Sequence, residues 1–307
     1  MDLAEKIKQK AFELGFHKIG FARAEILTEE LEFLKAWLSK GFHGEMKWLE
    51  KEPEKRADPK QLFPEVKTVI CAAMNYYTPY EYPKQVGKIS RYAWGEDYHE
   101  VLKKKLHELL AYIKTLDERA EGKVCVDTSP ILEKAWAVKA GLGWIGKHTN
   151  LITKEYGSWV FLGEILINLE ISDSATIETD HCGNCRACID ACPTNAISEP
   201  YQLNASLCIS YATIELRKAE IPETISKKLE GWFYGCDICQ EVCPWNRFQK
   251  PTEQEAFKPR ANTIVDLEEI LSMDEKKYAE RFRRSAMKRA KLHGLKRNAK
   301  ALKSNVS

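Results

Sequence analysis

Apolar residues recur with the period of an α-helix at the start of the chain, where Leu3, Ile7, Ala11 and Leu14 share one face. Gly15 follows at a position where helices commonly stop. The pattern then predicts a strand at 18–22, a helix at 29–40, a surface loop at 50–64, a strand at 66–74, a helix at 97–119, a strand at 123–127, a helix at 130–140 and a hairpin of strands 150–153 and 159–169. Helices that alternate with strands in this way predict an α/β (α+β) layered domain.

The remaining chain has a different character, because cysteines and short irregular segments replace the regular periodicity after about residue 175. Helical patterns return around 267–271 and 278–302. We therefore expect three parts: an α/β domain over 1–175, a cysteine-rich domain over 176–250 and a helical C-terminal segment over 251–307.

Two runs of closely spaced thiols mark the cysteine-rich domain. The first contains Cys182, Cys185, Cys188 and Cys192 before a proline, and the second contains Cys236, Cys239 and Cys243 before a proline. This spacing is that of bacterial iron–sulfur proteins, in which the last cysteine of each run ligates the other cluster. The second run lacks one thiol, and we assign Cys208 to that place.

Two four-iron four-sulfur clusters then use all eight thiols and predict a ferredoxin-like domain. Cys182, Cys185 and Cys188 would bind one cluster with Cys243, and Cys236, Cys239 and Cys208 would bind the other with Cys192. Structural zinc sites are the alternative, but zinc favours two separated cysteine pairs over four thiols in eleven residues. We expect the two other cysteines, Cys71 and Cys125, to be buried in apolar strands.

Charge is distributed unevenly along a chain whose net charge is only +2. Residues 276–303 carry twelve Lys or Arg against the single acid Glu280, so this segment is +11 and the remainder is −9. Such asymmetry suggests a nucleic-acid partner, although a solvated helix face is the ordinary alternative. The sequence shows no export signal and no membrane span, so we expect a cytoplasmic protein and, by default, a monomer.

Three local patterns are candidates for chemistry. Gly141-Leu-Gly143-Trp-Ile-Gly146 matches the dinucleotide fingerprint, but it follows a predicted helix instead of a strand, so we expect glycines that turn or pack closely. Asp127 ends a predicted strand, where partial burial would raise its pKa and let it donate a proton, or where it would merely complement a helix dipole. Asp97 lies in an aromatic segment that either lines a pocket or starts a solvated helix.

Several of these segments together resemble the epoxyqueuosine reductases. They are the doubled cysteine run with Cys208, Asp127-Thr-Ser-Pro-Ile-Leu-Glu-Lys, Gly-Leu-Gly-Trp-Ile-Gly-Lys-His-Thr-Asn150 and Arg91-Tyr-Ala-Trp-Gly-Glu-Asp97-Tyr98-His99. The resemblance covers about residues 1–300. It implies an oxidoreductase that uses cobalamin to remove the epoxide oxygen of epoxyqueuosine in a tRNA anticodon loop, which gives queuosine.

The resemblance also implies roles for individual residues. Asp127 would be the proton donor, Asp97 would lie near the substrate, and the cobalamin site of the N-terminal domain would be lined by Arg56, Asp97, Asp127, His148, Asn150 and Leu151. A small ferredoxin or flavodoxin would supply electrons through the clusters, and the basic residues of 276–303 would hold tRNA phosphates. Members of the family commonly continue into helical repeats beyond the step that here reads Arg297-Asn-Ala, which leaves the tRNA affinity of this chain open.

Two other functions remain as alternatives. The reductive dehalogenases also combine cobalamin with paired clusters, but they usually carry a twin-arginine signal. A non-catalytic electron carrier would explain the cysteine runs and leave Asp127 and the N-terminal domain without a role.

Overall fold

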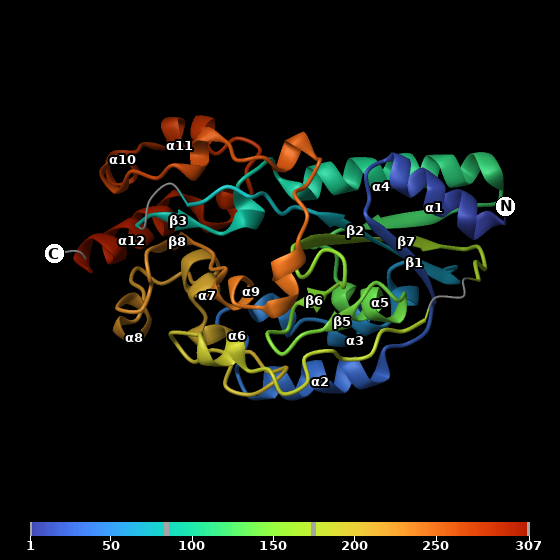
Figure 1. Ribbon diagram of the computed structural model, residues 1–307, viewed down its shortest axis with the longest axis horizontal. Helices are drawn as coiled ribbons and strands as arrows, with labels where there is room; N and C mark the ends of the chain where they lie inside the picture. The colour runs from blue at the N-terminus through green and yellow to red at the C-terminus, as the bar shows by residue number, and fades with distance from the viewer. Residues whose placement is uncertain (1, 83–85, 173–175, 306–307) are drawn as a thin grey trace.

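The computed structural model describes residues 2–82, 86–172 and 176–305. Its centre is a four-stranded sheet in the order β1-β2-β7-β4, in which every neighbouring pair is antiparallel (Figure 1). The strands are β1 (Lys18–Arg23), β2 (Thr68–Asn75), β7 (Val160–Ile167) and β4 (Gly122–Cys125). These strands confirm the strand predictions at 18–22, 66–74 and 123–127 to within two residues.

Helices cover both faces of this sheet, as Figure 1 shows. The helices α1 (Leu3–Glu13) and α4 (Tyr98–Leu116) pack on one face, and α2 (Thr28–Ser39), α3 (Pro53–Ala57) and α5 (Glu133–Lys139) pack on the other. All eight residues of β2 are buried, because its alternate side chains enter the two cores. Cys71 and Cys125 are fully buried on the α5 side, which confirms their prediction as core residues.

The predicted hairpin between 150–153 and 159–169 is wrong. The short strand β6 (Leu151–Ile152) pairs with β5 (Trp144–Ile145), whereas β7 pairs with β2 and β4. An isolated bridge from Thr153 to Gly157 joins the two segments. Both edges of β7 are occupied by strands of the main sheet, so β7 has no edge to offer to β6.

Glycines of the fingerprint-like segment have structural roles. Gly141 has a left-handed φ of 74° just after α5, which ends the helix. A β-carbon at Gly143 would collide with the backbone carbonyl of Ile152. The segment therefore turns and packs closely, as expected, and does not open a helix as a dinucleotide site would.

The cysteine-rich part consists of short helices joined by loops. They are α6 (Ala187–Asp190), α7 (Ile209–Ile214), α8 (Glu223–Ser226) and α9 (Ile238–Glu241). The strand β8 (Trp232–Tyr234) pairs in parallel with β3 (Lys88–Ile89), which links this part to the N-terminal part. One hydrophobic core includes Trp94, Phe233 and Leu295, so side chains from all three parts of the sequence pack together.

The long helix predicted at 278–302 is divided in the structure. The segment forms α11 (Glu275–Arg281), a short 3-10 helix (Ala286–Ala290) and α12 (Lys291–Ser304), while α10 (Leu267–Ser272) lies where a helix was expected. On one continuous helix, Phe282 and Ala286 would face away from Leu295 and Ala299, yet all four enter one core. The break lets both sets reach it. Within the described ranges, no helix is both long and apolar enough to cross a membrane.

Candidate active site

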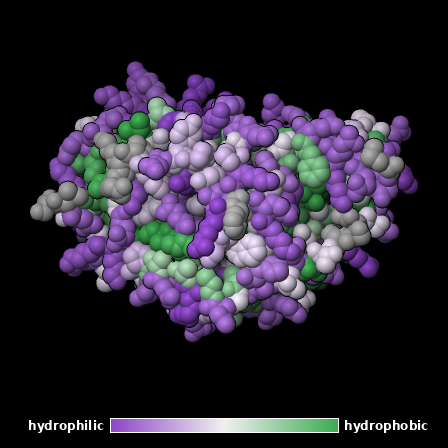
Figure 2. Space-filling view, in the orientation of Figure 1, coloured by the Kyte–Doolittle hydropathy of each residue, from purple (hydrophilic) through white to green (hydrophobic). Residues whose placement is uncertain are grey.

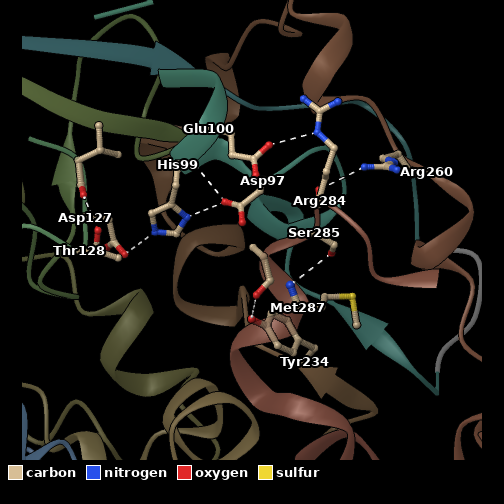
Figure 3. Close-up of polar contacts among 12 residues, drawn as sticks. Asp97, His99, Glu100, Asp127, Thr128, Tyr234, Arg260, Arg284, Ser285 and Met287 are labelled. Carbon is tan, nitrogen blue, oxygen red and sulfur yellow. Dashed lines mark hydrogen bonds and ion pairs between the residues drawn. The ribbon is translucent and has the colours of Figure 1, made fainter. Parts of the chain in front are cut away.

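His99 lies between two carboxylates that are 30 residues apart in the sequence (Figure 3). Its Nδ1 is 2.6 Å from Oδ1 of Asp97, and its Nε2 is 2.7 Å from Oδ2 of Asp127. Asp97 precedes α4, and Asp127 follows β4 by two residues. The start of one helix and the end of one strand thus meet at this imidazole.

Local backbone chemistry explains both carboxylate positions. Asp97 is the N-cap of α4, and its carboxylate accepts from the backbone N–H of His99 at 3.1 Å. Asp127 has a left-handed φ of 38°, a conformation that aspartate tolerates better than most residues. Its own N–H donates to Oε2 of Glu133 at 3.1 Å, which ties the turn after β4 to the start of α5.

The shared proton of this constellation belongs to His99. Burial lowers the pKa of His99, but hydrogen bonds to Asp127 and Asp97 outweigh it and raise the pKa to about 9. Burial also pushes the pKa of Asp127 upward, but the imidazolium holds it below its usual value. The expectation that burial raises the pKa of Asp127 is therefore wrong, because sequence reasoning missed its cationic neighbour. The signal was a histidine in the first turn after a capping aspartate.

A cavity of about 280 Å³ lies beside these groups. Tyr98 connects the cavity to the His99 site, because its ring lines the cavity and also stacks on His99, with ring centroids 4.1 Å apart. The same ring stacks on Phe161 at 4.3 Å. Burial, and then the negative charge of Asp127, raise the pKa of the Tyr98 phenol. The lining comes from the end of β2, from β6, from β7 and from α9 with the loop before it, and includes Tyr76, Asn150, Leu151, Val160, Leu162, Cys236, Asp237 and Gln240.

Only two of the residues expected to line the cobalamin site belong to the lining of this cavity. Asn150 and Leu151 line it, and Nζ of Lys134 holds Asn150 through Oδ1 at 3.0 Å. His148 is buried and borders a second, smaller cavity, and its Nε2 has no hydrogen-bond partner among the described residues. Arg56 stacks over Trp48 at 5.1 Å.

The eight thiols of the cysteine runs fall into two spatial groups. Four of them line the second cavity of about 130 Å³: Cys182, Cys185, Cys188 and Cys243. In the other group, burial chiefly raises the pKa of Cys239, and Cys208, Asp237, Cys188 and Cys192 add to the rise. Burial and then Cys208 raise the pKa of Cys236. In this grouping each set contains one thiol from the opposite run, and the exchanged cluster ligands stay a prediction.

The two groups differ in their access to solvent and to the large cavity. Cys185 of the first group is exposed, whereas Cys236 of the second group lines the 280 Å³ cavity. The first group therefore lies toward the surface and the second toward the cavity.

Several cations of the basic segment 276–303 have structural partners. Arg297 is buried and donates to the carbonyls of Leu216 and Ala212 at 2.5 and 2.7 Å. Arg289 donates from Nε and Nη2 to the two carboxylate oxygens of Glu215, at 2.7 and 2.8 Å. Lys303 pairs with Glu268 at 2.6 Å. Exposed cations of the segment without an ion pair to a described acid include Lys276, Lys277, Arg283, Lys288, Lys291 and Lys300, and Figure 2 shows a largely hydrophilic surface over α10 and α11.

Comparison with known families and sequences agrees with the cysteine pattern and with the resemblance. A family described as "Epoxyqueuosine reductase QueG, DUF1730" matches residues 56–128, and a "4Fe-4S double cluster binding domain" matches residues 181–246. An epoxyqueuosine reductase of Atelocyanobacterium thalassa is 45% identical over 308 residues, which cover 98% of this chain and 99% of that protein. One from Cellulophaga algicola is 46% identical over 304 residues and 98% of each chain.

Solved structures of such enzymes share the whole fold. An epoxyqueuosine reductase with an epoxyqueuosine-modified tRNA-Tyr stem loop superposes with a TM-score of 0.91 at 30% identity, over 99% of this chain and 81% of that one. The Streptococcus thermophilus enzyme gives a TM-score of 0.89 at 34% identity, over 100% of this chain and 82% of that one. The chain therefore belongs to the epoxyqueuosine reductase family.

Proposed function

We propose that this protein reduces the epoxide of epoxyqueuosine in the anticodon loop of tRNA and so forms queuosine. The observation that carries the proposal is the Asp97–His99–Asp127 constellation beside a cavity that Cys236 also borders. Proton-holding groups and cluster ligands thus converge on one space. Reduction of an epoxide to an alkene needs both, because it consumes two electrons and two protons and releases water.

The cavity residues suit cobalamin. Leu151, Val160 and Leu162 offer apolar surface for a macrocycle, and Lys134 and Asn150 offer polar groups for its amide side chains. Asn150 and Leu151 would hold the cofactor, with Arg56 and His148 at its edges. Bound there, cobalamin would supply a reducing cobalt centre next to the substrate.

Two four-iron four-sulfur clusters would deliver the electrons. Cys182, Cys185, Cys188 and Cys243 would bind the cluster that receives electrons from a small ferredoxin or flavodoxin, because this group reaches the surface at Cys185. The cluster bound by Cys192, Cys208, Cys236 and Cys239 would pass them on, because Cys236 lines the cavity.

Protonation of the departing oxygen is the task of Asp127 and His99. The imidazolium holds the proton, and Asp127, half exposed at the mouth of the site, passes it to the oxygen. Acid catalysis of this kind accelerates a reaction roughly 100- to 10,000-fold. A solved Bacillus subtilis relative has its catalytic loop swung out of the active site, and we propose that the turn at Asp127 moves similarly.

The tRNA would approach over the basic segment. Exposed Arg283 and Lys291 carry no ion pair to a described acid, so their charges remain available to phosphates. Lys288 is also exposed, and its charge helps to lower the pKa of Asp97. We also propose that the domains span residues 1–175, 176–250 and 251–307 and that the protein is a monomer.

Single-turnover conversion tests it directly. Anaerobically reconstituted protein with cobalamin and a strong reductant should convert epoxyqueuosine-containing tRNA to queuosine, as measured by nucleoside mass analysis, and omission of cobalamin should abolish conversion. Loaded protein that forms no queuosine would contradict the proposal. Turnover of small halogenated compounds would then indicate a dehalogenase, and protein that retains clusters but no corrin would indicate an electron carrier.

A further inference from the structure

A second carboxyl group reaches the same cavity from α5. Glu133 lines the cavity, and its Oε2 accepts the backbone N–H of Asp127 at 3.1 Å. Asp127 is thus held on one side by the imidazolium of His99 and on the other by Glu133. The proposed reaction needs two protons, and the His99–Asp127 pair holds one of them.

The charges around Glu133 favour its protonated form. Asp97 and Asp127 are two anions, and the cations that act on Glu133 itself are the His99 imidazolium and the Lys134 ammonium. Lys288 and Arg289 are further cations that act on Asp97 and on Asp127, respectively. Nζ of Lys134 donates to the carbonyl oxygen of Thr149 and to Oδ1 of Asn150, both at 3.0 Å, as an ammonium would. An ionised Glu133 would add a third carboxylate next to Asp127 in a partly buried position, which makes its charge costly.

The pKa values agree with this charge count. Burial, and then the negative charge of Asp127, raise the pKa of Glu133 to about 7, although Lys134, the hydrogen bond from the backbone N–H of Asp127 and His99 oppose the rise. Burial lowers the pKa of Lys134. A cofactor that covered the cavity would exclude more water and strengthen the rise at Glu133.

The sheet behind Glu133 supplies no compensating cation. Cys71, Glu164 and Cys125 lie in one row across β2, β7 and β4, and all three are fully buried. Neither carboxyl oxygen of Glu164 has a hydrogen-bond partner among the described residues, and burial followed by the charge of Glu133 raises its pKa well above the usual range. Burial raises the pKa of both thiols, so these three groups are neutral.

We infer that Glu133 is the second proton donor of the site, which gives its carboxyl proton to the oxygen that leaves the epoxide. The inference rests on the proposed function. Both carbon–oxygen bonds of the epoxide break, a carbon–carbon double bond forms, and the oxygen leaves as water. Two electrons come through the clusters from the external one-electron donor, one proton comes from the His99–Asp127 pair, and the other comes from Glu133.

The test compares Glu133→Gln with Glu133→Asp. Glutamine can still accept the N–H of Asp127 but carries no transferable carboxyl proton, so the single-turnover rate should fall about 100-fold. The decline of the rate as pH rises through about 7 should also disappear. Glu133→Asp keeps a carboxyl and should retain part of the rate and the pH dependence. Glu118→Gln, at an exposed glutamate, is the matched control and should behave as the wild type.

A second measurement does not depend on activity. Infrared difference spectra of the cluster-containing protein should show a protonated carboxyl that titrates near pH 7 in the wild type and in Glu164→Gln and is lost in Glu133→Gln. The signal of Asp237, whose pKa burial raises to about 6, should remain in all three. Queuosine formation by Glu133→Gln at the wild-type rate and pH profile, or a carboxyl titration near pH 7 that this substitution leaves unchanged, would overturn the inference and leave the proposed function intact. Loaded wild-type protein without queuosine formation would refute the proposed function itself, and the inference with it.

Discussion

The backbone N–H of Asp97 donates to the carbonyl oxygen of Arg284 at 2.9 Å. Figure 3 shows this contact region, where the basic segment lies against the start of α4. Arg284 adopts a left-handed φ of 54°, and its guanidinium pairs with Glu100 at 3.1 Å and with Glu96 at 3.3 Å. Arg260 donates to the same carbonyl at 3.2 Å. The segment proposed to meet tRNA thus directly contacts the aspartate that orients His99.

Arg284 should matter through its backbone more than through its charge. Arg284→Gly keeps the left-handed conformation and should retain the carbonyl contact and most of the single-turnover rate. Arg284→Val places a β-branched residue at positive φ, which should cost about 1–3 kcal/mol of stability and reduce the rate by loosening Asp97. Urea unfolding and single-turnover assays of both variants measure this. Equal loss in the two would instead assign the effect to the lost ion pairs.

His99→Gln should remove the imidazolium that carries a proton in the site. The single-turnover rate should fall roughly 100- to 10,000-fold while cluster and corrin spectra stay unchanged. In the wild type, the rate should also decline as pH rises through about 9, because the imidazolium loses its proton there. This high-pH decline should be missing in the variant. A variant that keeps the wild-type pH profile would place the proton elsewhere.

Cys192→Ser should damage the cluster that is distant in sequence. Because Cys192 groups with Cys208 and Cys239 in space, electron paramagnetic resonance of the reduced variant should show a perturbed cavity-side cluster and an intact surface-side cluster. Cys243→Ser is the matched variant and should give the reverse pattern. Selective loss of the surface-side cluster in Cys192→Ser would contradict the exchanged ligands.

Arg297→Met should destabilise the fold without a specific effect on RNA affinity. Its guanidinium serves the buried carbonyls of Leu216 and Ala212, which would lose their donors. The free energy of unfolding should therefore fall by about 2–4 kcal/mol, as measured by urea denaturation. A folded variant with unchanged stability but weaker tRNA binding would instead indicate that Arg297 contacts the RNA.

Charge reversal at Arg283 and Lys288 should weaken tRNA binding. Both side chains are exposed, so their replacement by glutamate should lower affinity and flatten its dependence on salt concentration, as measured by filter binding. Lys6→Glu, on α1 at the opposite end of the molecule in Figure 1, is the control. Unchanged salt dependence in the Arg283 and Lys288 variants would indicate that the basic segment is an ordinary solvated helix face.

Local pattern was sufficient where the relevant contacts are local. The thiol spacing of the two runs indicated iron–sulfur ligands, and apolar periodicity located β1, β2, β4 and α4, because both are set by residues close in sequence. The stop of α5 at Gly141 could also be predicted from the helix signal alone.

Tertiary structure decided the features that depend on distant partners. β7 pairs with strands of the main sheet, whereas β6 pairs with β5. The C-terminal helical segment is interrupted, so Phe282 and Leu295 both enter one core. Most of all, the fold brought His99 to Asp127, and this long-range ion pair reversed the direction expected for the aspartate pKa. Sequence alone determined which groups can ionise or bind iron, whereas their protonation depends on distances that exist only after folding.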